Sequence, residues 1–166
     1  MACGVPHAFG GALALAYYAE PRATIDIDVN VFVPVDRADD VLGPLAQLGA
    51  DVADGCDDGP PGRTGPRAVG RDRDRPVLLV RPLPRRAARA VCEVPFADST
   101  LPILSAAHLT VCKVRFDRPK DWVDIDAMLA LGTSIDAAEV LRWVGRIAGD
   151  DDPRFDRIAA VLSTSG

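Results

Sequence analysis

Two aspartates separated by one residue are the strongest chemical signal in this sequence. Asp26 and Asp28 lie in residues 24 to 33, where polar and apolar residues alternate as in a β-strand. Residues at this spacing point to one face, with Cα atoms about 6.5 to 7 Å apart, so the carboxylates repel each other unless a cation lies between them. Magnesium fits, because carboxylates on a rigid strand leave coordination positions for waters and a triphosphate. The pair alone leaves open a solvated face at a sheet edge.

A glycine pair, Gly10–Gly11, begins a predicted helix fifteen residues before Asp26. Glycines at a helix start let backbone N–H groups approach a phosphate, although a plain turn is the more common use of such a pair. The combination of glycine pair, helix and the residues that follow is much more specific than any single part. Those residues are Arg22-x-Thr24-x-Asp26-x-Asp28.

The chain has only two lysines, Lys113 and Lys120, beside seventeen arginines. A lysine in such a background indicates a need for a compact ammonium, which can hold a triphosphate or counter charge that develops during phosphoryl transfer. Asp121 and Asp124 follow Lys120 and share one face of a predicted helix. The alternative for these two aspartates is the ordinary enrichment of acids in a first helical turn.

The elements that position these residues are predicted from periodicity and end signals. The alternating residues 24 to 33 predict a strand, and weaker signals predict strands at 77–80 and 91–96. Helices are predicted after Gly11, after Asp36, and four times in the region that begins at Ser105. We therefore expect an α+β fold with a small mixed sheet, flanking helices and a helical C-terminal half. Residues 1–104 form the expected α/β core, and residues 105–166 form a helical part of the same domain.

Composition bounds the class of protein. The 166 residues carry a net charge of −5, which argues against a protein that holds nucleic acid mainly by bulk positive charge. Four cysteines without a CxxC pair support neither a zinc site nor a disulfide scaffold. The sequence shows neither a secretory signal nor an apolar run long enough for a membrane span, so we expect a cytoplasmic protein. His7 and His108 lack metal-ligand neighbours at standard spacing, and we expect both to be structural.

The glycine and aspartate motifs together resemble the nucleotidyltransferase superfamily, in the minimal form of AbiEii/AbiGii-type toxins. The matching residues are Gly10, Gly11, Ala12, Leu13, Ala14, Arg22, Thr24, Asp26, Ile27 and Asp28. The family often has Gly-Ser where this chain has Gly10–Gly11, a departure that removes one hydroxyl ligand for phosphate. The resemblance implies magnesium-dependent transfer of a nucleoside monophosphate from an NTP to an acceptor. It also implies a toxin–antitoxin setting, with RNA or protein as acceptor and a cognate antitoxin as partner.

The resemblance also assigns roles to individual residues. Asp26 and Asp28 would hold one or two magnesium ions and act in catalysis, and Lys113 would bind the triphosphate. Family toxins follow this lysine with a basic residue-Asp-x-x-Asp motif, which Lys120, Asp121 and Asp124 match. Either aspartate of that motif would orient Lys113 or complete the site. The residues expected to contact the nucleotide are Gly10, Gly11, Arg22, Thr24 and Lys120.

Residues 59 to 92 depart from the family pattern. They hold nine arginines, six prolines and two acids, and carry a charge of +7. The family's third carboxylate is expected near residues 70 to 85, but Asp72 and Asp74 lie among arginines and not on an apolar strand. One explanation is a frameshift, because an adjacent frame can encode an acidic, aromatic strand (DLFFSYDPFHDA). A poorly structured arginine-rich loop is the other, and without a third acid the chain would be a catalytically impaired nucleotide-binding or interaction protein. The N-terminus also looks short for the family.

Overall fold

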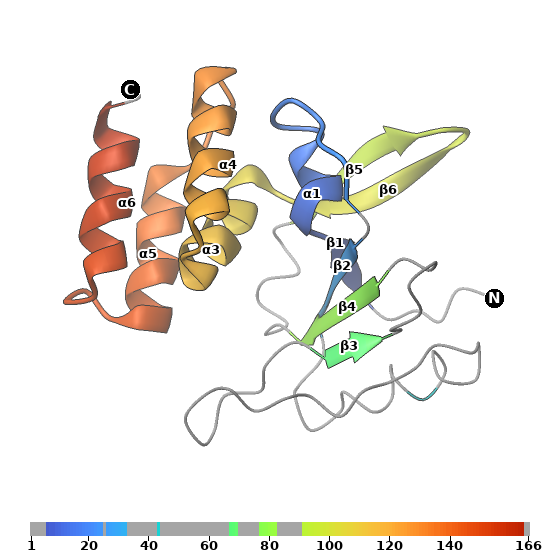
Figure 1. Cartoon of the computed structure of the whole chain (residues 1–166), viewed down its shortest axis with the longest axis horizontal. Helices are drawn as coiled ribbons and strands as arrows, with labels where there is room; N and C mark the ends of the chain where they lie inside the picture. Colours follow the sequence, from blue (N-terminus) through green and yellow to red (C-terminus); the bar gives the residue numbers. More distant parts are fainter. Residues whose placement is uncertain are drawn as a thin grey trace. The chain divides into compact units, whose positions relative to one another are not determined.

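The computed structural model describes residues 6–24, 26–32, 43, 67–69, 77–82 and 91–164, with the backbone alone for 26, 67–69 and 77–82. The described strands are β1 (His7–Phe9), β2 (Asp26–Val31), β3 (Arg67–Val69), β4 (Val77–Pro82), β5 (Val91–Phe96) and β6 (Ser99–Leu104). The described helices are α1 (Gly11–Leu15), α3 (Ala106–Phe116), α4 (Pro119–Ala130), α5 (Ala137–Ala148) and α6 (Pro153–Thr164) (Figure 1). This mixture of helices and a mixed sheet confirms the predicted α+β class.

The chain divides into two compact units. The sheet unit comprises residues 1–13 and 22–103, and the helical unit comprises residues 14–21 and 104–166. The chain thus passes between the units three times, within α1, between residues 21 and 22, and within β6. The division of one domain into residues 1–104 and 105–166 stays a prediction.

The sheet has the strand order β3-β4-β2-β1-β6-β5 within the described residues. β2 therefore lies inside the sheet, antiparallel to β1 and parallel to β4. Burial increases along β2, because Ile27, Asp28 and Val29 are half-buried whereas Asn30 and Val31 are buried. The strand thus presents Asp28 near its less buried beginning and anchors itself in the sheet through its end.

A two-residue turn joins β5 to β6 in a hairpin, which Figure 1 shows at one edge of the sheet. Ala97 in this turn has a φ of 48°, in the left-handed region that favours glycine. Phe96 is 50% exposed at the end of β5. Sequence analysis predicted β5 but neither β6 nor the three-residue strands β1 and β3.

The helical unit is built on α3, which packs against α4, α5 and α6. Its core is apolar and is formed by Ala107, Val111, Val114, Trp122, Ile125, Val140, Val144 and Ile158. The predicted cap of α3 is confirmed, because Ser105 Oγ accepts a hydrogen bond from the His108 N–H at 3.4 Å. α3 ends at Phe116, before Pro119, and Pro119 begins α4, where a first-turn residue needs no N–H donor.

Other predictions meet the described residues only in part. The helix predicted after Asp36 lies outside them, apart from Gly43, which is helical. The unusual residues 59 to 92 contribute β3, β4 and the first residues of β5. In the part of the chain that the structure describes, no helix is long and apolar enough to cross a membrane.

Candidate functional site

The two motif aspartates lie on β2, as their spacing predicts. Asp26 is the first residue of the strand, and Asp28 is its half-buried third residue. On the β4 side, Asp26 pairs with Val77 and Asp28 pairs with Leu79. β4 is thus a strand parallel to the aspartate strand in the segment where the family's third carboxylate is expected, but its six residues include no acid.

The glycine pair contacts Asp28 directly. The Gly10 N–H donates a hydrogen bond to the Asp28 carbonyl oxygen at 2.8 Å, so a phosphate at this turn would have to use other donors. Gly11 has a φ of 54°, and a Cβ on it would overlap Asp28 Oδ2. Position 11 therefore requires glycine for two reasons, its left-handed backbone conformation and the carboxylate that lies beside it.

Lys113 and Asp124 form a buried ion pair in the helical unit. Lys113 Nζ on α3 donates to Asp124 Oδ2 on α4 at 2.6 Å, and the side chains are 5% and 8% exposed. Removing one partner of such a buried pair costs about 3 to 5 kcal/mol, because the other charge is left uncompensated. An ammonium has three donors, and this pair uses one of them. Of the two aspartates considered as partners of Lys113, Asp124 makes the contact.

Asp121 instead binds Arg118, a residue that the sequence analysis did not select. The Asp121 carboxylate accepts from the Arg118 backbone N–H at 3.2 Å, from Nε at 2.6 Å and from Nη2 at 3.0 Å. Arg118 is the N-cap residue of α4, and Asp121 at position N3 accepts from its backbone N–H, which is one half of a capping box. Pro119 and Asp121 could have indicated that α4 begins at Arg118. Arg118 was missed because N-cap residues are usually Ser, Thr, Asp or Asn, whose side chains are short and polar.

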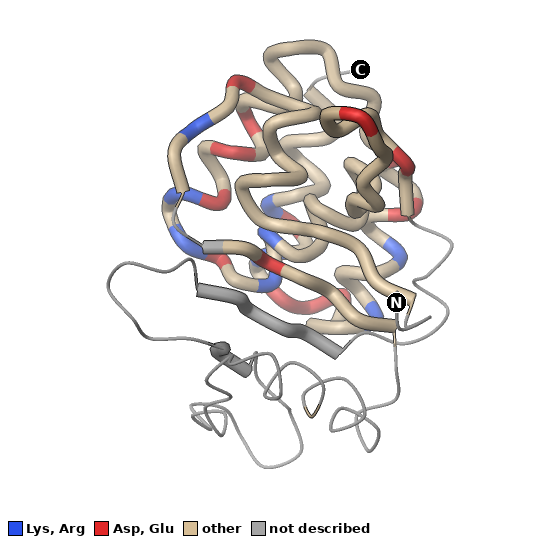
Figure 2. The backbone as a smooth tube through the Cα atoms, turned by 90° about the vertical axis from the view of Figure 1, so that its right-hand side faces the viewer, with Lys and Arg blue, Asp and Glu red and all other residues tan. Residues whose placement is uncertain are grey.

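The remaining predicted nucleotide contacts are exposed. Arg22 and Thr24 lie in the segment before β2, and Lys120 lies in the first turn of α4. Basic and acidic residues are interspersed along the described helices (Figure 2).

Asn30 is a buried polar residue on β2 that was not selected as a candidate. It is 1% exposed, and its Nδ2 donates to the Ala8 carbonyl oxygen at 3.4 Å. Its Oδ1 is buried and accepts no hydrogen bond from the residues that the structure describes. Alternation along a strand places it on the same face as Asp28.

His108 has a structural environment at the start of α3. Its Nδ1 lies 3.1 Å from Ser105 Oγ, and its Nε2 lies 3.7 Å from Glu139 Oε1 on α5. Burial lowers the pKa of His108 below its usual value; the Glu139 carboxylate opposes this shift and Arg142 adds to it. The Glu139 carboxylate also accepts from Trp143 Nε1 at 2.7 Å and from Arg142.

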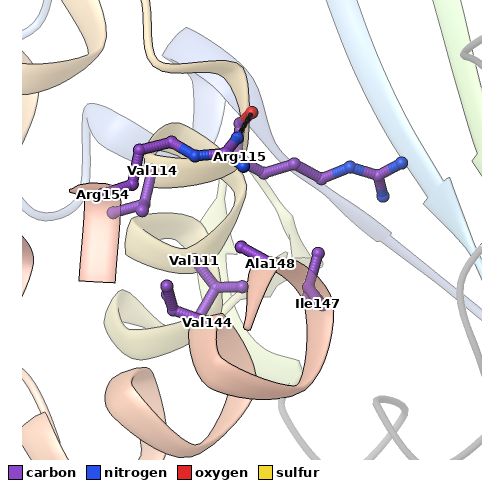
Figure 3. Close-up of a pocket in the computed structure, with 7 residues that line it drawn as sticks. All are labelled: Val111, Val114, Arg115, Val144, Ile147, Ala148 and Arg154. Carbon is purple, nitrogen blue, oxygen red and sulfur yellow. Dashed lines mark hydrogen bonds between the residues drawn. The ribbon is translucent and has the colours of Figure 1, made fainter. Parts of the chain in front are cut away.

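A hollow between α3, α5 and α6 is too small for a nucleotide. Its free volume is about 10 Å³, roughly the space of one water molecule. Figure 3 shows its lining residues, Val111, Val114, Arg115, Val144, Ile147, Ala148 and Arg154. Arg154 Nη1 donates to the Arg115 carbonyl oxygen at 3.1 Å, which links the last turn of α3 to the first turn of α6. This hollow belongs to the packing of the helical unit.

The donor set on β2 fits a divalent cation that shares its coordination with a substrate. Magnesium is commonly bound by one or two carboxylates together with substrate phosphates, and Asp26 and Asp28 provide two carboxylates on one strand. Within the described residues no group of three His, Cys, Asp or Glu side chains could hold a metal. Waters and substrate phosphates commonly complete the coordination of magnesium at sites with one or two carboxylates.

The fold is shared with solved nucleotidyltransferase structures, although neither a protein-family model nor a curated protein sequence matches the chain. The lincomycin-bound lincosamide antibiotic adenylyltransferase LnuA is 12% identical, with a TM-score of 0.54 over 78% of this chain and 88% of LnuA. The antibiotic-resistance factor ANT(2'')-Ia is 13% identical, with a TM-score of 0.51 over 96% and 83%. An antigenic nucleotidyltransferase-like protein from Paracoccidioides brasiliensis is 15% identical, with a TM-score of 0.52 over 96% and 80%. At these identities the likeness is one of fold, and the fold of this chain is that of the nucleotidyltransferases.

Proposed function

We propose that this protein transfers a nucleoside monophosphate from an NTP to an acceptor hydroxyl, with magnesium held by Asp26 and Asp28. The observation that carries this proposal is the seating of Asp28 against the glycine pair at the start of α1, on a strand inside a nucleotidyltransferase-like sheet. Magnesium bound there would draw in the triphosphate and stabilise the charge on the leaving pyrophosphate. Asp26 and Asp28 would bind the cation, and the exposed Arg22 and Thr24 would contact the nucleotide.

The buried pair in the helical unit has a complementary role in this proposal. The resemblance assigns binding of the triphosphate to Lys113, and Asp124 would fix the direction of its ammonium. Asp121, which is bound to Arg118, would hold the beginning of α4. Lys120, in the same turn, would add a second positive charge for the nucleotide.

The proposal includes three classes of acceptor for the nucleoside monophosphate. The resemblance to AbiEii/AbiGii-type toxins favours RNA or protein as acceptor, with a cognate antitoxin as partner. The structurally similar LnuA is a lincosamide antibiotic adenylyltransferase, and a small molecule is therefore the third acceptor to test.

The test is incorporation of label from each [α-³²P]NTP into bulk tRNA, total cellular protein or lincomycin, with and without magnesium. We expect magnesium-dependent labelling of one acceptor, reduced about a hundredfold or more in Asp26→Asn and Asp28→Asn. Asp98→Asn is the matched control, because Asp98 is an exposed aspartate in the β5–β6 turn. Labelling that persists in both β2 variants would contradict the proposal.

A second candidate function is nucleotide binding without turnover. It is favoured by β4, which lies beside Asp26 and Asp28 and includes no acid. Calorimetric titration with α,β-methylene-ATP and magnesium separates the two functions. Binding without labelling of any of the three acceptors would favour the second function, and absence of both binding and labelling would refute both.

A further inference from the structure

Gly11 and Asp28 lie in close contact, with no room between them for a side chain at position 11. An added Cβ at Gly11 would overlap Asp28 Oδ2, and would lie 2.7 Å from Asp28 Cγ and 3.0 Å from Asp28 Cβ. The Asp28 side chain therefore lies against the α-carbon of Gly11, with Oδ2 as its nearest atom to the added Cβ. The neighbouring hydrogen bond from the Gly10 N–H to the Asp28 carbonyl oxygen fixes the two backbones to each other.

We propose that Gly11 is a positioning residue that sets the location of the Asp28 carboxylate for cation binding, an inference that rests on the proposed function. The outer torsion of an aspartate is broad and leaves its oxygens free to rotate. A backbone surface against one oxygen restricts that freedom, and ligands held in place before a cation arrives do not have to be ordered when it binds. The glycine pair thereby acts on the metal site through Asp28, in addition to any contact with a phosphate.

Gly132 provides a control within the same chain. It follows α4 with a φ of 73°, close to the 54° of Gly11, but nothing lies within 4 Å of a Cβ added there. Alanine at either position meets the same kind of backbone strain, because both have a positive φ. Only alanine at position 11 also displaces a carboxylate, so the difference between the two substitutions isolates the contact with Asp28.

The first test is a double-mutant cycle read by urea unfolding. We expect Gly11→Ala to lower the urea midpoint further than Gly132→Ala does. In an Asp28→Ala background most of this excess should disappear, because the overlapping oxygen is gone and only the Cβ of position 28 remains nearby. If Gly11→Ala alone does not fold, Gly11→Ala/Asp28→Ala should still fold. A double variant that is as damaged as Gly11→Ala alone would overturn the inference.

The second test measures cation binding directly, with Mn²⁺ as the probe and electron paramagnetic resonance as the readout. We expect Gly11→Ala to weaken Mn²⁺ binding about tenfold or more, as loss of a supporting contact does at metal sites. Gly132→Ala should leave the dissociation constant within about twofold. Equal Mn²⁺ affinity in Gly11→Ala and the parent chain would overturn the inference. Coupling in the unfolding cycle without Mn²⁺ binding by the parent chain would instead refute the proposed function, and would retain Gly11 as the residue that seats Asp28.

Discussion

Asp28 of the sheet unit and Asp124 of the helical unit are held in place by opposite means. Asp28 is half-buried and rests on the bare backbone of Gly11. Asp124 is buried and rests on the ammonium of Lys113. The contact with Gly11 is steric and involves no charge of the carboxylate, whereas the ion pair with Lys113 uses the charge of Asp124 inside the protein. The comparison separates a carboxylate suited to bind a metal from one suited to direct a neighbouring side chain.

The largest effect on stability is expected when the buried pair is broken on one side. Lys113→Met leaves Asp124 as a buried charge without its counter-ion and should lower the free energy of unfolding by about 3 to 5 kcal/mol, measured by urea denaturation. The double variant Lys113→Met/Asp124→Leu should recover most of this loss, because two apolar side chains leave no charge to desolvate. A double variant less stable than Lys113→Met would show that the ion pair stabilises the fold by more than the neutralisation of its two buried charges.

An intermediate effect is expected at Arg118, whose partner Asp121 is buried although the arginine side chain is 49% exposed. Arg118→Ala removes the two side-chain hydrogen bonds to Asp121 but keeps the one from the backbone N–H, and should cost about 1 to 2 kcal/mol. Arg118→Lys keeps the charge but loses the planar donor pair, and should fall between the parent and alanine. Equal stability of the lysine and arginine chains would mean that charge alone holds Asp121.

A smaller effect is expected at the more exposed pair between Asp152 and Arg154. Hydrogen bonds from the Arg154 side chain and backbone lower the pKa of Asp152 to about 2. The carboxylate therefore contributes stability that is present above its ordinary pKa near 3.8 and is lost as the pH falls through about 2. In Arg154→Gln we expect the Asp152 pKa, followed by NMR titration, to rise toward its ordinary value. An unchanged pKa would assign the shift to another group.

The smallest change in stability is expected for Asp28→Asn, which keeps the size of the side chain that rests on Gly11. The free energy of unfolding, measured by urea denaturation, should move by less than it does in Asp124→Asn, while Mn²⁺ binding is lost. Asp124→Asn should show the opposite pattern, with a large loss of stability, because Lys113 is left without its counter-ion. A destabilisation by Asp28→Asn as large as that by Asp124→Asn would remove the distinction between the two carboxylates.

Much of the fold follows from local sequence, and the rest depends on partners distant in the chain. The alternation around Asp28 predicts β2, and Ser105 predicts the start of α3, because both signals lie within a few residues. The three-residue strands β1 and β3 are too short to show alternation, and Pro102 within β6 argues against a strand. Their pairing partners, not their own residues, make them strands.

The candidate site shows the same division. The spacing of Asp26 and Asp28 places both on one strand, and this pattern is readable from the residues alone. The partner of Lys113 cannot be read from the residues alone, because Asp121 and Asp124 share a helix face. The choice between them depends on how α4 packs against α3. The contact between Gly11 and Asp28 is likewise invisible in sequence, since it depends on the pairing of β1 with β2.

The turn of the β5–β6 hairpin leaves room for engineering. Ala97 adopts a left-handed conformation that costs a residue with a side chain roughly 1 to 2 kcal/mol. Glycine at this position would remove that strain without touching Asp28, Lys113 or their contacts. Ala97→Gly should therefore raise the stability of the chain. This gain could offset the loss in variants with damaging changes at the candidate site, so that they can be crystallised or used in binding studies.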